Sequence, residues 1–212
     1  MIVMKNFYKS VMSILLVTPI YASAAVDLVT NGSFEADLQD NGSWNLYSNL
    51  IGWSGAPDIE LRNNVAGSAF DGSNFIELDT NSNSSISQLL VGTPGLYQLS
   101  FWFSARPGTG SDTNDLSFTL DGSAPVTVLT GVGGGSDHNW QNYSALFNFD
   151  GEALLTFSAV GRSDSLGGSL DMISMTSTIP EPKIVEMILV GFLLLSLTLR
   201  RTSKAYFSRN NL

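Results

Sequence analysis

The residues best suited to bind a ligand are an aromatic ring and two charged side chains on β-prone runs. Trp102 alternates with apolar residues in the run 95–105, so we expect its ring on the face opposite the core. An exposed ring can stack on a sugar, and Arg106 close behind it can hydrogen-bond hydroxyl or acid groups. The run 74–78 could add Glu77 on the same face. Trp102, Arg106 and Glu77 therefore form a candidate carbohydrate-binding site.

The same residues also have a purely structural interpretation. Trp102 could pack under a loop, and Arg106 could pair with an internal acid. Composition favours internal pairing, because residues 25–179 hold only Arg62, Arg106 and Arg162 against 17 Asp and Glu. The sequence is compatible with both interpretations.

No arrangement for enzymatic catalysis stands out. The chain has no Cys, which excludes thiol catalysis, disulfides and zinc sites built on Cys. Its one histidine, His138, follows glycines 133–135. The sequence displays no pre-organised nucleophile for which His138 could act as a catalytic base. These glycines lack the Lys-Ser/Thr that completes a phosphate loop. We expect a non-enzymatic protein, with a polysaccharide-active enzyme that uses paired carboxylates as the alternative.

The charge is distributed unevenly along the chain. The 212 residues carry a net charge of −9, which divides into +2 over residues 1–24, −14 over 25–179 and +3 over 180–212. The acidic middle lacks the clustered Lys and Arg that bind phosphate backbones, so no nucleic-acid partner is expected. The length suits one domain with additional segments at its ends.

Residues 25–179 are predicted to form an all-β antiparallel sandwich, because short β-prone runs alternate with Gly, Asn, Asp and Ser clusters. The predicted strands are 58–61, 74–78, 85–90, 95–105, 116–120, 126–129, 143–149, 153–159 and 170–175. Period-two alternation puts Tyr97, Leu99, Phe101 and Phe103 towards the core. The three tryptophans in loop-like sequence are expected to cover the ends of the sandwich; they are Trp44, Trp53 and Trp140.

Several short motifs follow one another in an order typical of a known fold. They are Asn31-Gly32-Ser33-Phe34-Glu35, Gly52-Trp53, Asp71-Gly72-Ser73-Asn74-Phe75-Ile76-Glu77-Leu78, Ile86-Ser87-Gln88, Gly95-Leu96-Tyr97-Gln98-Leu99-Ser100-Phe101 and Gly168-Ser169-Leu170-Asp171-Met172-Ile173. Over residues 27–176 the chain is similar to galactose-binding-like jelly rolls, which include carbohydrate-binding modules.

This resemblance implies a structural calcium ion between two acids, one in the N-G-x-F-E opening and one in the last strand. Glu35 and Asp171 match those two positions. Calcium takes six to eight hard oxygen ligands, and backbone carbonyls can supply those that carboxylates do not. The alternative is that Glu35 caps a turn and Asp171 is exposed. The sequence departs from the family pattern at Met172, where a second acid is usual.

Residues 1–24 have the three parts of a secretory signal peptide. Lys5 and Lys9 make the start basic, residues 11–21 are apolar, and Ala22-Ser23-Ala24 provides small residues for cleavage. Cleavage is predicted after Ala24, with cleavage after Ala25 as the alternative. A short N-terminal core helix is the alternative, although Pro19 would end such a helix there.

The apolar run 184–199 is predicted to cross a membrane as a helix. Arg200 and Arg201 follow it at once, which places this end in the cytoplasm and residues 25–179 outside. A helix buried in the domain is the alternative for this run.

With Pro180-Glu181-Pro182 in front of it, the segment 180–212 resembles the PEP-CTERM sorting signal of Gram-negative bacteria that make exopolysaccharide. The resemblance implies recognition by an exosortase-like sorting protease. The expected route is export through the inner membrane, a single-pass membrane intermediate, and then the cell surface or extracellular matrix. There the chain would bind exopolysaccharide, or act as a structural protein without a ligand.

Overall fold

The computed structural model describes residues 25–178 and 191–192. Residues 25–178 contain strands and turns but no helix, whereas residues 191–192 are helical. The predicted signal peptide 1–24 and nearly all of the predicted sorting segment 180–212 lie outside the described residues. Within the described ranges, no helix has the length and apolar character needed to cross a bilayer.

Ten strands make up the domain. They are β1 (Ser43–Leu50), β2 (Trp53–Asn63), β3 (Asn74–Glu77), β4 (Ser85–Val91), β5 (Gly95–Ser104), β6 (Leu116–Leu120), β7 (Val126–Leu129), β8 (Gln141–Phe149), β9 (Glu152–Ala159) and β10 (Ser169–Ser177).

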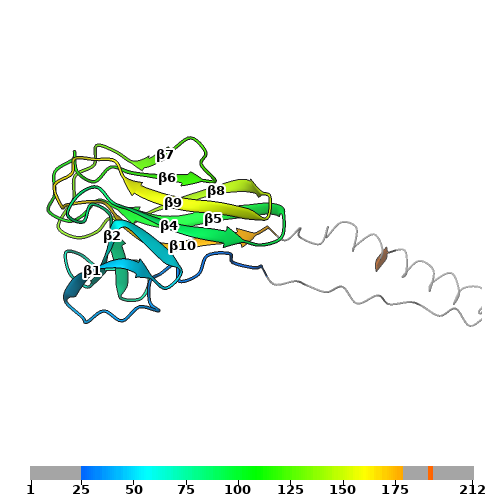
Figure 1. Ribbon diagram of the computed structural model, residues 1–212, viewed down its shortest axis with the longest axis horizontal. Coiled ribbons are helices and arrows are strands. Elements are labelled where there is room, and N and C mark those ends of the chain that lie inside the picture. The colour runs from blue at the N-terminus through cyan, green and yellow to red at the C-terminus, as the bar shows by residue number, and fades with distance from the viewer. Residues whose placement is uncertain (1–24, 179–190, 193–212) are drawn as a thin grey trace, which may run out of the picture.

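The strands are hydrogen-bonded in the order β7-β6-β9-β4-β2-β3-β10-β5-β8, with β1 paired to β2, and every pairing is antiparallel. Strand β2 belongs to both layers, because Ser54–Ala56 pair with β4 while Glu60–Asn63 pair with β3. In Figure 1 the strands of the two layers overlap in projection, and β1 and β2 lie near one end of the domain. The predicted all-β antiparallel sandwich is confirmed.

Aromatic and aliphatic side chains from both layers fill the space between the sheets. The ring of Phe101 on β5 lies 4.8 Å from that of Phe157 on β9 and 5.5 Å from that of Phe118 on β6, edge to face in both cases. Such pairs stabilise a core beyond the area that they bury. The predicted core face of residues 95–105 is confirmed: Tyr97, Leu99, Phe101 and Phe103 are all buried.

Each of the nine predicted strands coincides with an observed strand, but the sequence did not reveal β1 or the full length of β2. Trp44 lies in β1, and Trp53 opens β2 with its ring buried in the core. The expectation that these two rings cover the sandwich from loops was therefore wrong. Trp140 does lie in a loop, just before β8.

The outer face of the sheet that contains β1, β2, β3, β10 and β5 carries two neighbouring rows of side chains, because residues paired across antiparallel strands share a face. One row consists of Leu46, Glu60, Glu77, Ser169 and Ser104. The other runs from Trp44 through Arg62 to Phe75 and resumes with Asp171 and Trp102. The strand register thus gathers charged and aromatic residues that are distant in the sequence.

Candidate functional site

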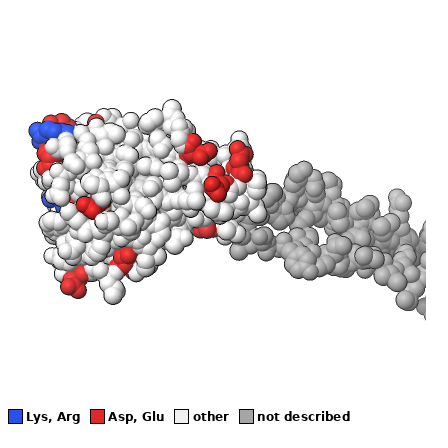
Figure 2. Space-filling model, viewed as in Figure 1, with Lys and Arg blue, Asp and Glu red and all other residues white. Residues whose placement is uncertain are grey.

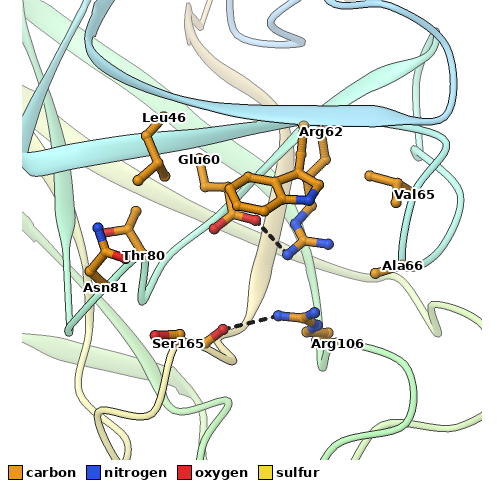
Figure 3. Close-up of a pocket in the computed structure, with 10 residues that line it drawn as sticks. Leu46, Glu60, Arg62, Val65, Ala66, Thr80, Asn81, Arg106 and Ser165 are labelled. Atoms are coloured by element: carbon orange, nitrogen blue, oxygen red, sulfur yellow. Dashed lines mark hydrogen bonds and ion pairs between the residues drawn. The ribbon is translucent and has the colours of Figure 1, made fainter.

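A pocket of about 260 Å³ opens over the β1–β2 part of this outer face. It is lined by Trp44, Leu46, Glu60, Arg62, Val65, Ala66, Thr80, Asn81, Arg106 and Ser165. Figure 3 shows Glu60, Arg62 and Arg106 facing the same space, with Thr80 and Asn81 on one side and Val65 and Ala66 on the other. Strands β1 and β2 and four loops, which follow β2, β3, β5 and β9, therefore meet at a single cavity.

Four charged side chains of alternating sign form a chain beneath this pocket. Arg62 pairs with Glu60 through Nη2, and its Nε lies 3.1 Å from Glu77 Oε2. On the other side, Arg106 Nη1 donates to Glu77 Oε1 at 2.7 Å and to the Ser165 carbonyl at 3.1 Å. The Glu77 carboxylate is therefore held between two guanidinium groups, and the four charges sum to zero.

The backbone around Glu77 also supports its charge. The Gly167 amide donates to Glu77 Oε1 at 3.0 Å. A side chain at position 167 could not fit, since a Cβ there would lie 1.3 Å from the Leu78 carbonyl oxygen. The glycine thus allows the β9–β10 loop to approach closely enough for its amide to reach the carboxylate.

Burial shifts the protonation of both acids. Desolvation raises the pKa of Glu77 to about 7, against the opposing effect of Arg62 and Arg106. Desolvation also raises the pKa of Glu60, although Arg62 beside it acts in the opposite direction. A carboxyl group with a strongly shifted pKa directly beneath a pocket, as at Glu77, is a candidate member of a functional site.

Trp44 forms the accessible aromatic wall of the pocket. Its side chain is 50% exposed, and it sits opposite Arg62 in the β1–β2 pairing. Two other lining residues, Ala66 and Ser165, have φ angles of 54° and 64°, which is the left-handed region. Non-glycine residues held there store backbone strain, and such strain clusters at ligand-binding sites.

The structure brings together only part of the predicted carbohydrate site. Glu77 and Arg106 form an ion pair, as the structural interpretation of Arg106 required. Trp102 shares their sheet face but does not line the pocket. Its ring stacks against Phe70 with centroids 3.7 Å apart and planes 14° apart. One face of the predicted platform is therefore covered by the β2–β3 loop.

A second loop fastens this cover. Trp140 donates from Nε1 to the Ser68 carbonyl at 3.0 Å, and Asp137 accepts from the Ser68 amide at 3.1 Å. His138 Nδ1 lies 2.8 Å from the same carbonyl and Nε2 lies 2.9 Å from Ser169 Oγ. Burial lowers the pKa of His138, so the ring is neutral at pH 7; Nδ1 donates to the carbonyl and Nε2 accepts from the hydroxyl. His138 is engaged in holding the two loops together.

The two predicted calcium ligands contact the same short loop. Glu35 Oε1 accepts from the amides of Ser73 and Asn74 at 2.8 and 2.6 Å. Asp171 is fully buried, and its Oδ2 accepts from the amides of Phe70 and Asp71 at 2.8 and 3.0 Å. Burial raises the pKa of Asp171 to about 7.

A calcium ion at this position would need ligands beyond these two carboxylates. Glu35 Oε2 still has lone pairs to offer a cation, but among the described residues no group of three or more His, Asp or Glu side chains could hold one. Any calcium here would therefore depend on oxygens from the backbone or from water for most of its ligands.

Sequence reasoning missed Trp44, Glu60 and Arg62, which complete the pocket. Glu60 and Arg62 alternate with Ile59 and Leu61, a period-two signal that places both charges on the outer face. Nothing local to residues 43–50 shows that this segment pairs with β2 and brings Trp44 beside them.

No protein-family model and no curated protein matches the chain. Among solved structures, TmCBM61 in complex with β-1,4-galactotriose is 20% identical over 72% of this chain and 99% of that chain, with a TM-score of 0.47. A family 35 carbohydrate-binding module from Clostridium thermocellum is 14% identical over 64% and 99%, with a TM-score of 0.42. The enzymatically active domain of bacteriophage CBA120 tailspike protein 4 is 15% identical over 70% and 21%, with a TM-score of 0.43. At these values the likenesses assign neither a family nor a function.

The Glu77 carboxyl should titrate with a midpoint near pH 7 rather than near 4.5 in a ¹³C NMR experiment. Because the folded state then holds this proton more tightly than the unfolded state, the free energy of unfolding should fall as the pH rises from about 4.5 to about 7, by on the order of 3 kcal/mol, and level off above that. Glu77→Gln should remove this resonance, and with it the contribution of Glu77 to the pH dependence of the free energy of unfolding. Asp171→Asn should retain the Glu77 resonance. A Glu77 midpoint near 4.5 would contradict the effect of burial.

Proposed function

We propose that the chain is a non-enzymatic binding module of the galactose-binding-like jelly-roll type, and that its pocket takes a sugar unit of an extracellular polysaccharide. The observation that carries this proposal is the half-exposed Trp44 beside the buried charges of Glu60, Arg62 and Glu77 and the partly buried Arg106.

The burial of three charges and the partial burial of Arg106 favour a functional role for this network over a purely structural one. Desolvating an ion costs several kcal/mol, and packed apolar side chains often stabilise a fold equally well or better than a buried ion pair. The side chains of Glu60 and Arg62 are only 5% and 4% exposed, yet both line the pocket. Stability alone does not explain the placement of this network below an opening.

The chemistry of the pocket suits a sugar. The volume of about 260 Å³ is below the roughly 300–1,000 Å³ of pockets for drug-sized ligands, so one sugar unit is an appropriate occupant. Trp44 offers a flat apolar surface to a ring, while carboxylate and guanidinium groups accept from and donate to hydroxyls. Thr80 Oγ1, which has no partner among the described residues, can add a further hydrogen bond.

The enzyme alternative is less well supported by the geometry. Glu77 has the shifted pKa of a general acid, but its side chain is 0% exposed and both of its oxygens are held by Arg62, Arg106 or the Gly167 amide. A general acid must reach the atom that it protonates, at about 3 Å or through one water. Glu77 acts instead as the internal counter-ion of the two arginines.

We propose that Trp44→Ala weakens binding of oligosaccharides on a glycan array, or of polysaccharide from the native host, by at least about tenfold, because it removes the aromatic wall. Leu146→Ala is the matched control, since Leu146 is 59% exposed on β8 and lies outside the pocket lining. Trp102→Ala should lower thermal stability through the lost stack with Phe70 and leave binding within about twofold.

Three outcomes would contradict this proposal. An array without any bound glycan would favour a structural protein that lacks a ligand. Equal loss of binding in Trp44→Ala and Leu146→Ala would show that binding does not depend on the pocket. Turnover of matrix glycans that stops when an acid pair is substituted would support the enzyme alternative.

Calcium is proposed as a structural ion, with Glu35 and Asp171 as its carboxylate ligands. Binding of Ca²⁺ to the folded state alone would stabilise it by about 2.7 kcal/mol at a hundredfold excess over the Kd. We therefore expect EGTA to lower the melting temperature of the purified chain by several degrees and Ca²⁺ to restore it. Glu35→Gln should abolish the effect of EGTA and Ca²⁺ on the melting temperature. Asp121→Asn is the control and should retain this effect, because Asp121 is an exposed turn residue. A melting temperature that EGTA does not change would contradict the proposal.

The ends of the chain are proposed to direct it through the inner membrane to an exosortase-like protease and then to the cell surface or matrix. Mass spectrometry of the mature protein from fractionated host cells should give an N-terminus at Ala25 and loss of the segment that follows Pro180-Glu181-Pro182. Deletion of the exosortase should leave the C-terminal segment intact and the protein in the membrane fraction. An unprocessed chain in the soluble fraction of wild-type cells would contradict this route.

A further inference from the structure

We infer that the pocket is selective for neutral sugars, and that it discriminates against uronic acids and other sugars with an anionic substituent. This inference rests on the proposed function, because it names the class of sugar that the same pocket would take. It follows from how the charges of the pocket are already paired, which atoms remain for a ligand, and which charges surround the opening.

The two arginines of the pocket are already neutralised by acids of the chain. Glu77 pairs with both Arg62 and Arg106, and Glu60 pairs with Arg62 a second time. A ligand carboxylate would therefore meet no uncompensated cation. It would bring the local charge from zero to −1 beside the Glu60 and Arg62 side chains, which are almost fully shielded from solvent, and like charges repel more strongly there than in water.

The atoms left for a ligand form mixed donor and acceptor pairs. Within the described residues, Thr80 Oγ1, Glu60 Oε1 and Arg62 Nε are buried without a hydrogen-bond partner. None of the ion pairs of Glu60, Arg62 and Arg106 uses Glu60 Oε2, Nη1 of Arg62 or Nη2 of Arg106. A sugar hydroxyl donates one hydrogen bond and accepts others, so two neighbouring hydroxyls can satisfy a carboxylate oxygen and a guanidinium nitrogen together. A carboxylate group only accepts, and it would leave Glu60 Oε2 facing another anion.

The rest of the domain adds to the selectivity. Residues 25–178 contain 17 acids against three arginines, and only Arg162 among these is largely exposed, with its side chain at 60%. Arg162 is itself paired with Asp112 and Asp164. Figure 2 shows acidic side chains distributed over the visible face, while basic atoms appear at one end of the domain. This field repels an anionic polysaccharide before it reaches the pocket.

Protonation offers a way to change the selectivity without changing the fold. Glu77 is faced by Arg62 and Glu60 from β2, by Arg106 after β5, by the Gly167 amide of the β9–β10 loop and by Ser169 of β10. Below pH 7 the protonated Glu77 leaves the four-residue network with a charge of +1. The discrimination against an acidic sugar should then decrease.

The test compares sugars that differ only at C6. The full-length chain is titrated with galactose and galacturonate, and with glucose and glucuronate, by ligand-observed NMR at pH 8 and at pH 5.5. For the pair in which the neutral sugar binds, the uronate should bind at least about tenfold more weakly at pH 8, and the ratio should fall several-fold at pH 5.5. Glu77→Gln should show the reduced ratio at both pH values, provided that its melting curve shows a folded protein.

The outcomes separate the inference from the proposed function. If a uronate binds as well as its neutral partner at pH 8, or better, neutral selectivity is wrong while the pocket remains a sugar site. If neither member of any pair binds, and oligosaccharides on the array do not bind either, the proposed function fails, and neutral selectivity with it. If Glu77→Gln does not fold, the role of Glu77 is tested by comparing the two pH values on the natural chain. A neutral sugar that binds tenfold or more tightly than the uronate at pH 8, with no decrease of this ratio at pH 5.5, would leave neutral selectivity in place. The same result would overturn the role assigned to Glu77.

Discussion

The Glu77 carboxylate, held between Arg62 and Arg106, is the contact on which the organisation of this end of the domain depends. It joins β2, β3, the segment after β5 and the β9–β10 loop, since Gly167 and Arg106 both donate to its Oε1. Removal of one member would leave a buried charge without its partner, which typically costs about 3–5 kcal/mol. The same contact neutralises both arginines, so one carboxylate sets both the rigidity of the pocket floor and its charge.

The loops above the outer face are held by a different principle, in which side chains bind backbone groups. Glu35 and Asp171 accept hydrogen bonds from backbone amides at the two ends of the segment 70–74. His138 and Trp140 both donate hydrogen bonds to the Ser68 carbonyl. Backbone groups of a loop need such partners where they are removed from water. The aromatic stack of Phe70 on Trp102 is therefore positioned by hydrogen bonds around it as well as by its own contact area.

Strand positions could be predicted from the sequence because alternation and turn residues are local signals. Residues 97–103 alternate between buried and more exposed side chains, and Asp71-Gly72 supplies a turn in which Gly72 has a φ of 64°. Strand β1 could not be found in this way, since its side chains are mostly exposed or half-buried and its sequence is rich in polar residues. The placement of Trp44 beside Arg62 depends on the register between β1 and β2, which no pattern within either segment encodes.

The candidate site was accordingly predictable in part. The face shared by Glu77 and Trp102 follows from period two, and the scarcity of arginine in an acidic domain favoured an internal partner for Arg106. Which ring stays accessible is instead a question of what the β2–β3 loop covers: Phe70 from this loop stacks on Trp102, while Trp44 remains half-exposed. An aromatic residue on an outer strand face is thus only a candidate platform until the loops are placed, and here the loops select Trp44.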